Sequence, residues 1–68
     1  MTQNAQILAH LNRGQSIDPM TALREYGCNR LAARILELRA AGVAIETEMR
    51  KVQTRSGSAT VAVYSLAN

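Results

Sequence analysis

The chain has 68 residues, enough for a single domain spanning residues 1–68, and a domain this small buries only about 60% of its unfolded surface. One cysteine excludes an internal disulfide, and one cysteine with one histidine is too few for a structural zinc site. The net charge is +3, and residues 30–68 carry all of it, because basic and acidic side chains balance in residues 1–29.

The first residues lack the basic start and long apolar run of a secretory signal, and no stretch approaches the roughly 20 apolar residues of a membrane span. We therefore expect a cytoplasmic protein without a membrane partner. Apolar side chains at helical spacing then predict a first helix over about residues 3–13. His10 falls within it, without a nearby cysteine, histidine or carboxylate, so we expect a packing role rather than a functional one. Residues 15–17 are long enough only for an isolated bridge to a sheet.

A second helix is predicted over residues 19–26. Asp18 can accept hydrogen bonds from the free amides of its first turn, and Pro19 has no amide to satisfy. Gly27 can adopt the left-handed conformation that ends a helix. We expect Asn29 to cap the helix that follows.

The packing of this second helix follows from its apolar residues. Met20 and Leu23 are expected to face the protein interior, with Ala22 and Tyr26 as further inward candidates. Cys28, in the short turn after the helix, is interpreted as a small buried apolar residue, with a reactive thiol as the alternative.

A third helix is predicted over about residues 30–41. Leu31, Ile35 and Leu38 recur at the spacing of one helix face, which indicates the stripe that packs on the core. We expect the opposite side to carry Arg30, Ala33, Arg34 and Glu37. A short helix, a tight turn containing glycine and a longer helix form the helix-turn-helix arrangement, whose second helix commonly enters the DNA major groove.

After Gly42 the apolar pattern alternates, which predicts antiparallel strands over about residues 43–52 and 59–66 with a hairpin tip at residues 53–58. In the first strand, Ile45, Thr47 and Met49 share one face, opposite Glu46, Glu48 and Arg50. In the second strand we favour burial of the face that carries Ala62, Tyr64 and Leu66, because it has more apolar area than the face of Val61 and Val63.

Three helices followed by a β-hairpin resemble the winged helix-turn-helix domain, an α+β fold. The run ALREYGCNRLAARILELRAAGVAIETEM at residues 22–49, with VAVYSL at residues 61–66, resembles a family of small helix-turn-helix proteins of phages and bacteria. The resemblance extends over about residues 7–66, and its specific part is residues 22–47.

The resemblance implies a double-stranded DNA-binding module, a phage or bacterial transcriptional regulator, with residues 30–41 in the major groove and residues 53–58 as the wing tip. Arginine and asparagine suit base edges, whereas cations on the hairpin suit phosphates, and Arg55 can alternatively enter the minor groove. The predicted DNA-binding residues are Asn29, Arg30, Ala33, Arg34, Glu37, Arg50, Lys51 and Arg55. We expect a monomer that pairs with a second copy on a repeated site.

A protein-docking module in a replication or transcription complex is the alternative. The charge of +3 is modest and fits an ordinary solvated surface as well, and Glu46 and Glu48 would repel phosphates that they faced. Enzymatic activity is not expected, because these two carboxylates have no metal-binding histidine or phosphate-binding glycine loop beside them. For the same reason we expect no cofactor and no metal.

Overall fold

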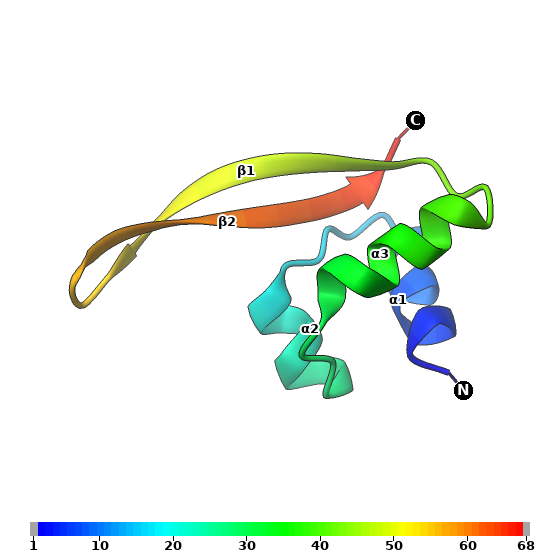
Figure 1. Ribbon diagram of the computed structural model, residues 1–68, viewed down its shortest axis with the longest axis horizontal. Coiled ribbons are helices and arrows are strands. Elements are labelled where there is room, and N and C mark those ends of the chain that lie inside the picture. The colour runs from blue at the N-terminus through cyan, green and yellow to red at the C-terminus, as the bar shows by residue number, and fades with distance from the viewer. Residues whose placement is uncertain (1, 68) are drawn as a thin grey trace.

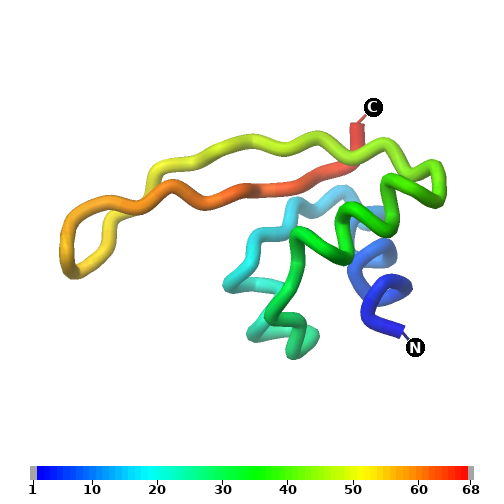
Figure 2. Tube along the Cα trace, viewed as in Figure 1, coloured from blue at the N-terminus to red at the C-terminus, as the bar shows by residue number. Residues whose placement is uncertain are grey.

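Within residues 2–67, three helices are followed by a two-stranded antiparallel hairpin, which confirms the predicted α+β class (Figure 1). The computed structural model describes residues 2–67, so the predicted domain limits at positions 1 and 68 lie outside the described residues. The elements are α1 (Gln3–Asn12), α2 (Pro19–Tyr26), α3 (Leu31–Ala40), β1 (Ile45–Thr54) and β2 (Gly57–Leu66). The chain trace shows the helices gathered beneath one end of the hairpin, while its other end projects beyond them (Figure 2).

His10 joins α1 to the segments around α2. Its side chain is buried, with Nε2 2.9 Å from the Ser16 carbonyl oxygen and Nδ1 2.7 Å from the Tyr26 hydroxyl. A carbonyl oxygen only accepts, so Nε2 carries the proton and donates to it, and Nδ1 accepts from the tyrosine. This geometry confirms the packing role expected for the histidine.

The predicted signals at both ends of α2 are confirmed. An Asp18 carboxylate oxygen accepts a hydrogen bond of 2.8 Å from the amide of Thr21, and Pro19 is the first helical residue. At the other end Gly27 has φ +65°, in the left-handed region that side chains other than glycine rarely adopt.

The expected cap of α3 is wrong. The helix begins at Leu31, so Arg30 and not Asn29 occupies the cap position, and no side chain caps this end. Asn29 lies one residue too early in the chain to accept from the amides of the first turn. The helix also ends at Ala40, so it is one residue shorter at each end than predicted.

The core lies between the three helices and the helix-covered end of the hairpin. Ile7, Leu11, Ile17 and Ile35 have at most 1% of their surface exposed. The expected inward orientation of Met20 and Leu23 is wrong, since these side chains are 66% and 50% exposed. Two small residues complete this buried cluster: Ala22 in α2 and Cys28 in the turn after it. The burial of Cys28 confirms the cysteine as a small core residue.

Met20 and Leu23 face outward because α2 packs on the core through the small residue Ala22. Its methyl group has no exposed surface, so α2 packs closely on its neighbours through this residue. Tyr26, one turn further along, packs against the same core. Because the face of α2 with Ala22 and Tyr26 packs on the core, Met20 and Leu23 lie on the sides of the helix that face solvent.

The strands pair from Ile45 with Leu66 to Thr54 with Gly57, so three of the four predicted strand limits shift toward the tip. β1 starts and ends two residues later than predicted, and β2 starts two residues earlier. The tip is therefore a two-residue turn of Arg55 and Ser56, not the predicted loop of residues 53–58. Gly57, with φ +132°, supplies the backbone conformation that lets the chain reverse this tightly.

The favoured face of β2 does pack on the core, because Tyr64, Ala62 and Leu66 join the buried cluster with Ile45. Val63 on the other face is nevertheless also buried, at 6% exposed, but it is not part of that cluster. Ile17 forms the expected isolated bridge, exchanging two backbone hydrogen bonds with Tyr64. On the same face as Tyr64, Met49 is 62% exposed, and Ile45 is the one buried residue of β1. The tip half of the hairpin projects beyond the helices (Figure 1).

Candidate nucleic-acid interface

The buried stripe of α3 sets the orientation of the whole helix. Leu31, Ile35 and Leu38 are 3%, 1% and 6% exposed, which confirms the predicted core stripe. A helix has 3.6 residues per turn, so fixing this stripe fixes the direction of every other side chain of α3. Three further sides remain: one toward α1, one toward the hairpin and one outward.

The side toward α1 holds two of the predicted DNA-binding residues. Arg34 Nη1 lies 3.1 Å from Glu37 Oε1, and the same oxygen accepts a 3.1 Å hydrogen bond from the Asn4 amide in α1. The Arg34 side chain is 30% exposed. The structure therefore brings Arg34 and Glu37 together as an ion pair on the flank of α3, where each partly neutralises the other.

The side toward the hairpin is closed by Arg39. Its guanidinium donates two hydrogen bonds, of 3.2 and 2.8 Å, to the Ile45 carbonyl oxygen and a third of 2.8 Å to the Thr47 hydroxyl. A planar fork on one backbone oxygen restricts rotation at the contact. Arg39 thus attaches the start of the hairpin to the end of α3.

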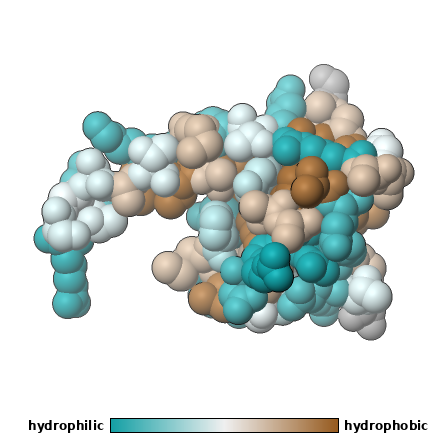
Figure 3. Space-filling view, viewed as in Figure 1, coloured by the Kyte–Doolittle hydropathy of each residue, from teal (hydrophilic) through white to brown (hydrophobic). Residues whose placement is uncertain are grey.

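The outward side is apolar. Ala32, Leu36 and Ala40 are exposed there, with the half-buried Ala33 beside them, and Leu36 is 68% exposed. In the space-filling view, brown and tan atoms gather over α3, with teal atoms above and below them (Figure 3). Of the predicted residues on this helix, Ala33 alone borders this side.

The two predicted residues before the helix, Asn29 and Arg30, are both exposed. Arg30 occupies the N-cap position of α3, and it forms no ion pair with any residue in the range 2–67. Its positive charge therefore stands free at the positive end of the helix dipole, which attracts anions as well.

The hairpin carries three predicted residues in three different settings. Arg50 forms an exposed ion pair of 3.2 Å with Glu48. Lys51 is the next residue, so it points to the other face of the strand, the one that includes Ile45. Arg55 lies in the turn. Within the described part of the chain, neither Lys51 nor Arg55 forms an ion pair.

Sequence reasoning missed two residues of this surface, Leu36 and Arg39. Leu36 falls outside the stripe of Leu31, Ile35 and Leu38, and that mismatch is a signal that identifies an exposed leucine. Arg39 gave no comparable signal, because its partner is a backbone oxygen, which every residue of the hairpin possesses.

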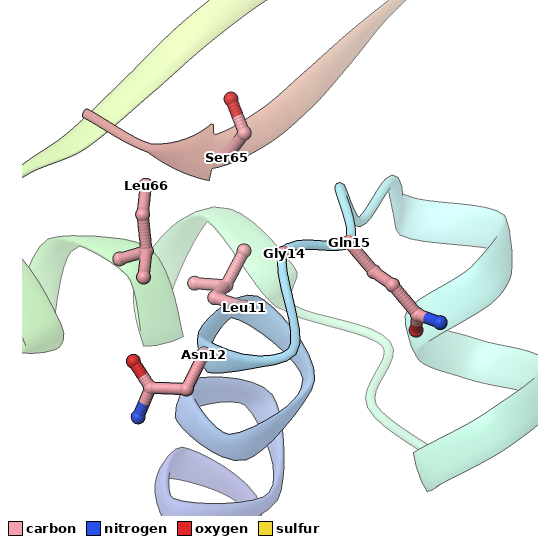
Figure 4. A pocket seen from close by; sticks show the side chains of 6 residues that line it. All are labelled: Leu11, Asn12, Gly14, Gln15, Ser65 and Leu66. Carbon is pink, nitrogen blue, oxygen red and sulfur yellow. The ribbon is translucent and has the colours of Figure 1, made fainter. Parts of the chain in front are cut away.

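A pocket at the helix-covered end of the hairpin offers little chemistry. It lies between the end of α1, the turn after it and the end of β2, and is lined by Leu11, Asn12, Gly14, Gln15, Ser65 and Leu66 (Figure 4). None of these side chains is an acid, a base or an activated nucleophile. Residues 2–67 contain no group of three potential metal ligands, and none of their helices is long and apolar enough to cross a membrane.

Comparison with known proteins identifies a family for this chain. The family model described as a winged helix-turn-helix domain matches residues 2–68, nearly the whole chain. No match was found among curated proteins or among solved structures.

Proposed function

The chain belongs to the winged helix-turn-helix family, and we propose that it binds double-stranded DNA as a single non-enzymatic module spanning residues 1–68. Domains with this architecture typically bind DNA, with the second helix of the motif in the major groove. On this proposal α3 enters the major groove, and the hairpin acts as the wing on the backbone or in the minor groove. No cofactor is required.

One observation supports the proposal above all: the start of α3 and the projecting hairpin carry cations that have no ion-pair partner within residues 2–67. Arg30 stands at the start of the helix, Lys51 on the hairpin face that includes Ile45, and Arg55 at the tip. Phosphates are the partners that such charges suit, and helix N-termini favour anions as well.

The proposed residue roles follow from these positions. Asn29 and Arg30 reach base edges from the start of α3, and Ala33 permits close approach. Arg34 and Glu37 take part after their ion pair opens. Arg50, Lys51 and Arg55 contact phosphates, with Arg55 in the minor groove as the alternative.

We further propose that the protein is a small phage or bacterial transcriptional regulator that works in the cytoplasm. A single module of this kind covers only about 600–1,000 Å² of its own surface on DNA. Tight specific binding therefore uses a second copy on a repeated site.

The salt dependence of DNA affinity tests this proposal. If about four to six phosphates are neutralised, the logarithm of affinity falls against the logarithm of salt concentration with a slope of about −4 to −5. Fluorescence anisotropy with a labelled random duplex, at several salt concentrations, measures the slope. A flat response, or no binding to any duplex, rejects DNA binding.

A protein-docking role in a replication or transcription complex is the second candidate. The exposed apolar side chains of Leu36, Met20 and Leu23 favour it, since such residues suit protein partners too. This role predicts that a purified partner protein shifts the amide resonances of α3 in an NMR titration, whereas DNA leaves them unchanged.

A further inference from the structure

The outward side of α3 carries no side chain that can form hydrogen bonds with bases. Arg39 is bound to the hairpin backbone, and Arg34 is paired with Glu37 on the flank toward α1. What remains is Leu36 with Ala33 and Ala32, which lie three and four residues before it and so form one continuous patch with it. The patch is apolar, with one large side chain in a setting of small ones.

From this patch we infer that α3 recognises thymine by the methyl group that it presents in the major groove, with Leu36 as the residue that determines this specificity. The inference rests on the proposed DNA binding. Among the four bases only thymine presents an apolar group in the major groove, and apolar side chains are its usual partners. The alanines allow the helix backbone to approach closely, and Leu36 extends beyond them toward the base edge.

The charges around the patch favour DNA over a protein as its occupant. Arg30 lies at the start of the same helix, and Lys51 and Arg55 lie on the hairpin, and none of the three has an ion-pair partner in the described chain. An apolar patch on a molecule with free cations at the start of the same helix and on the projecting hairpin matches a surface on which methyl groups lie between rows of phosphates. It matches an apolar protein partner less well, because such a partner would leave these cations uncompensated.

Replacing thymine by uracil isolates the methyl group. The substitution keeps every hydrogen-bonding atom of the base in both grooves and removes only the methyl. The probe is a duplex selected by the protein from a random 20-base-pair pool, compared with a copy in which all thymines are uracil. Burial of one methyl group corresponds to about fourfold in affinity, so one or two contacts predict about 4- to 15-fold weaker binding of the uracil copy.

The variant Leu36→Ala tests whether Leu36 causes the weaker binding of the uracil duplex. It is expected to bind the thymine and uracil duplexes within about twofold of each other, and to fold normally because Leu36 is 68% exposed. The matched control is Leu23→Ala, another exposed leucine, which is expected to keep the wild-type ratio.

Three results overturn the inference, in distinguishable ways. Equal binding of thymine and uracil duplexes by the wild-type protein rejects methyl recognition and leaves DNA binding intact. If Leu36→Ala keeps the wild-type ratio of thymine-duplex to uracil-duplex affinity, a residue other than Leu36 recognises the methyl group. Absence of binding to any duplex rejects the proposed function itself, and a protein partner then becomes the occupant of the patch.

Discussion

Asp18 shows how one side chain supports the fold. Hydrogen bonds from the Thr21 side chain and then from its backbone amide hold the pKa of Asp18 below its ordinary value of 3.8. Replacing an N-cap residue by alanine typically costs about 1 kcal/mol. We therefore expect Asp18→Ala to lower the free energy of unfolding by about 1 kcal/mol at pH 7, as measured by urea denaturation.

The sign of the pH dependence follows from the lowered pKa. A carboxyl group with a lower pKa in the folded state stabilises the protein above its unfolded pKa, and this contribution is lost as the pH falls through the folded pKa. Asp18→Asn keeps an accepting oxygen but does not titrate, so its stability relative to wild type should improve below about pH 4. A constant difference between the two proteins from pH 7 to pH 3 would contradict this role of the carboxylate.

At the scale of the element, α2 is positioned by a small residue and not by its large ones. Ala22 has no exposed surface, whereas Leu23 is 50% exposed. Overfilling a packed site typically costs about 1–3 kcal/mol. Ala22→Leu is therefore expected to lower the free energy of unfolding by about that amount, and Leu23→Ala by less than about 0.5 kcal/mol. The reverse order of the two variants in thermal or urea unfolding would restore the orientation expected from the sequence.

The attachment of the hairpin to α3 gives a second prediction at this scale. Arg39→Ala removes three hydrogen bonds that join the helix to β1. Hydrogen bonds from charged donors contribute about 1.5–3 kcal/mol to stability when they are buried, and less when solvent reaches them. We expect the hairpin to sample a wider range of orientations relative to the helices, seen as smaller residual dipolar couplings for its amides.

Arg39→Lys serves as the charge-matched comparison for this experiment. Lysine keeps the positive charge but lacks the planar fork, so it should also loosen the hairpin. Arg24→Ala, at an exposed position on α2, is the control and should leave the couplings unchanged. Couplings that stay at wild-type values in Arg39→Ala would show that the core contacts of Ile45 and Tyr64 alone orient the hairpin.

What the sequence predicts at this scale depends on whether the signal is local. Asp18 and Gly27 mark the limits of α2 correctly, because capping and left-handed glycine act within a few residues. The inward placement of Met20 and Leu23 was wrong, because the orientation of α2 depends on how closely Ala22 packs against other elements. The cap of α3 failed for a related reason: Asn29 has the right chemistry, but the turn places Arg30 at the helix start.

The candidate site was predictable to a similar degree. The identity of α3 and the core stripe of Leu31, Ile35 and Leu38 followed from periodicity. Periodicity could not predict which other side chains of α3 lack partners. The ion pair of Arg34 with Glu37 and the hydrogen bonds of Arg39 form only when α3 packs against α1 and the hairpin.

At the scale of the whole molecule, the projecting hairpin determines the shape. The radius of gyration is 12.1 Å and the extents are 37 × 25 × 20 Å, whereas a compact chain of this length has a radius of gyration of about 11 Å. The part of the hairpin beyond the helices has little core to stabilise it, and its outer residues are exposed. An extended arm with a cation in its turn, beside a helix with a cation at its start, presents two points of contact to one long polyanion.

An NMR titration of isotope-labelled protein with double-stranded DNA tests this account most directly, because it reports binding and its location together. We expect amide shift changes to concentrate at Arg30 before α3, at Leu36 on α3 and at Arg55 in the turn of the hairpin, while the amides of α1 change little. Saturable binding with its shift changes confined to α1, or spectra that DNA leaves unchanged, would contradict it.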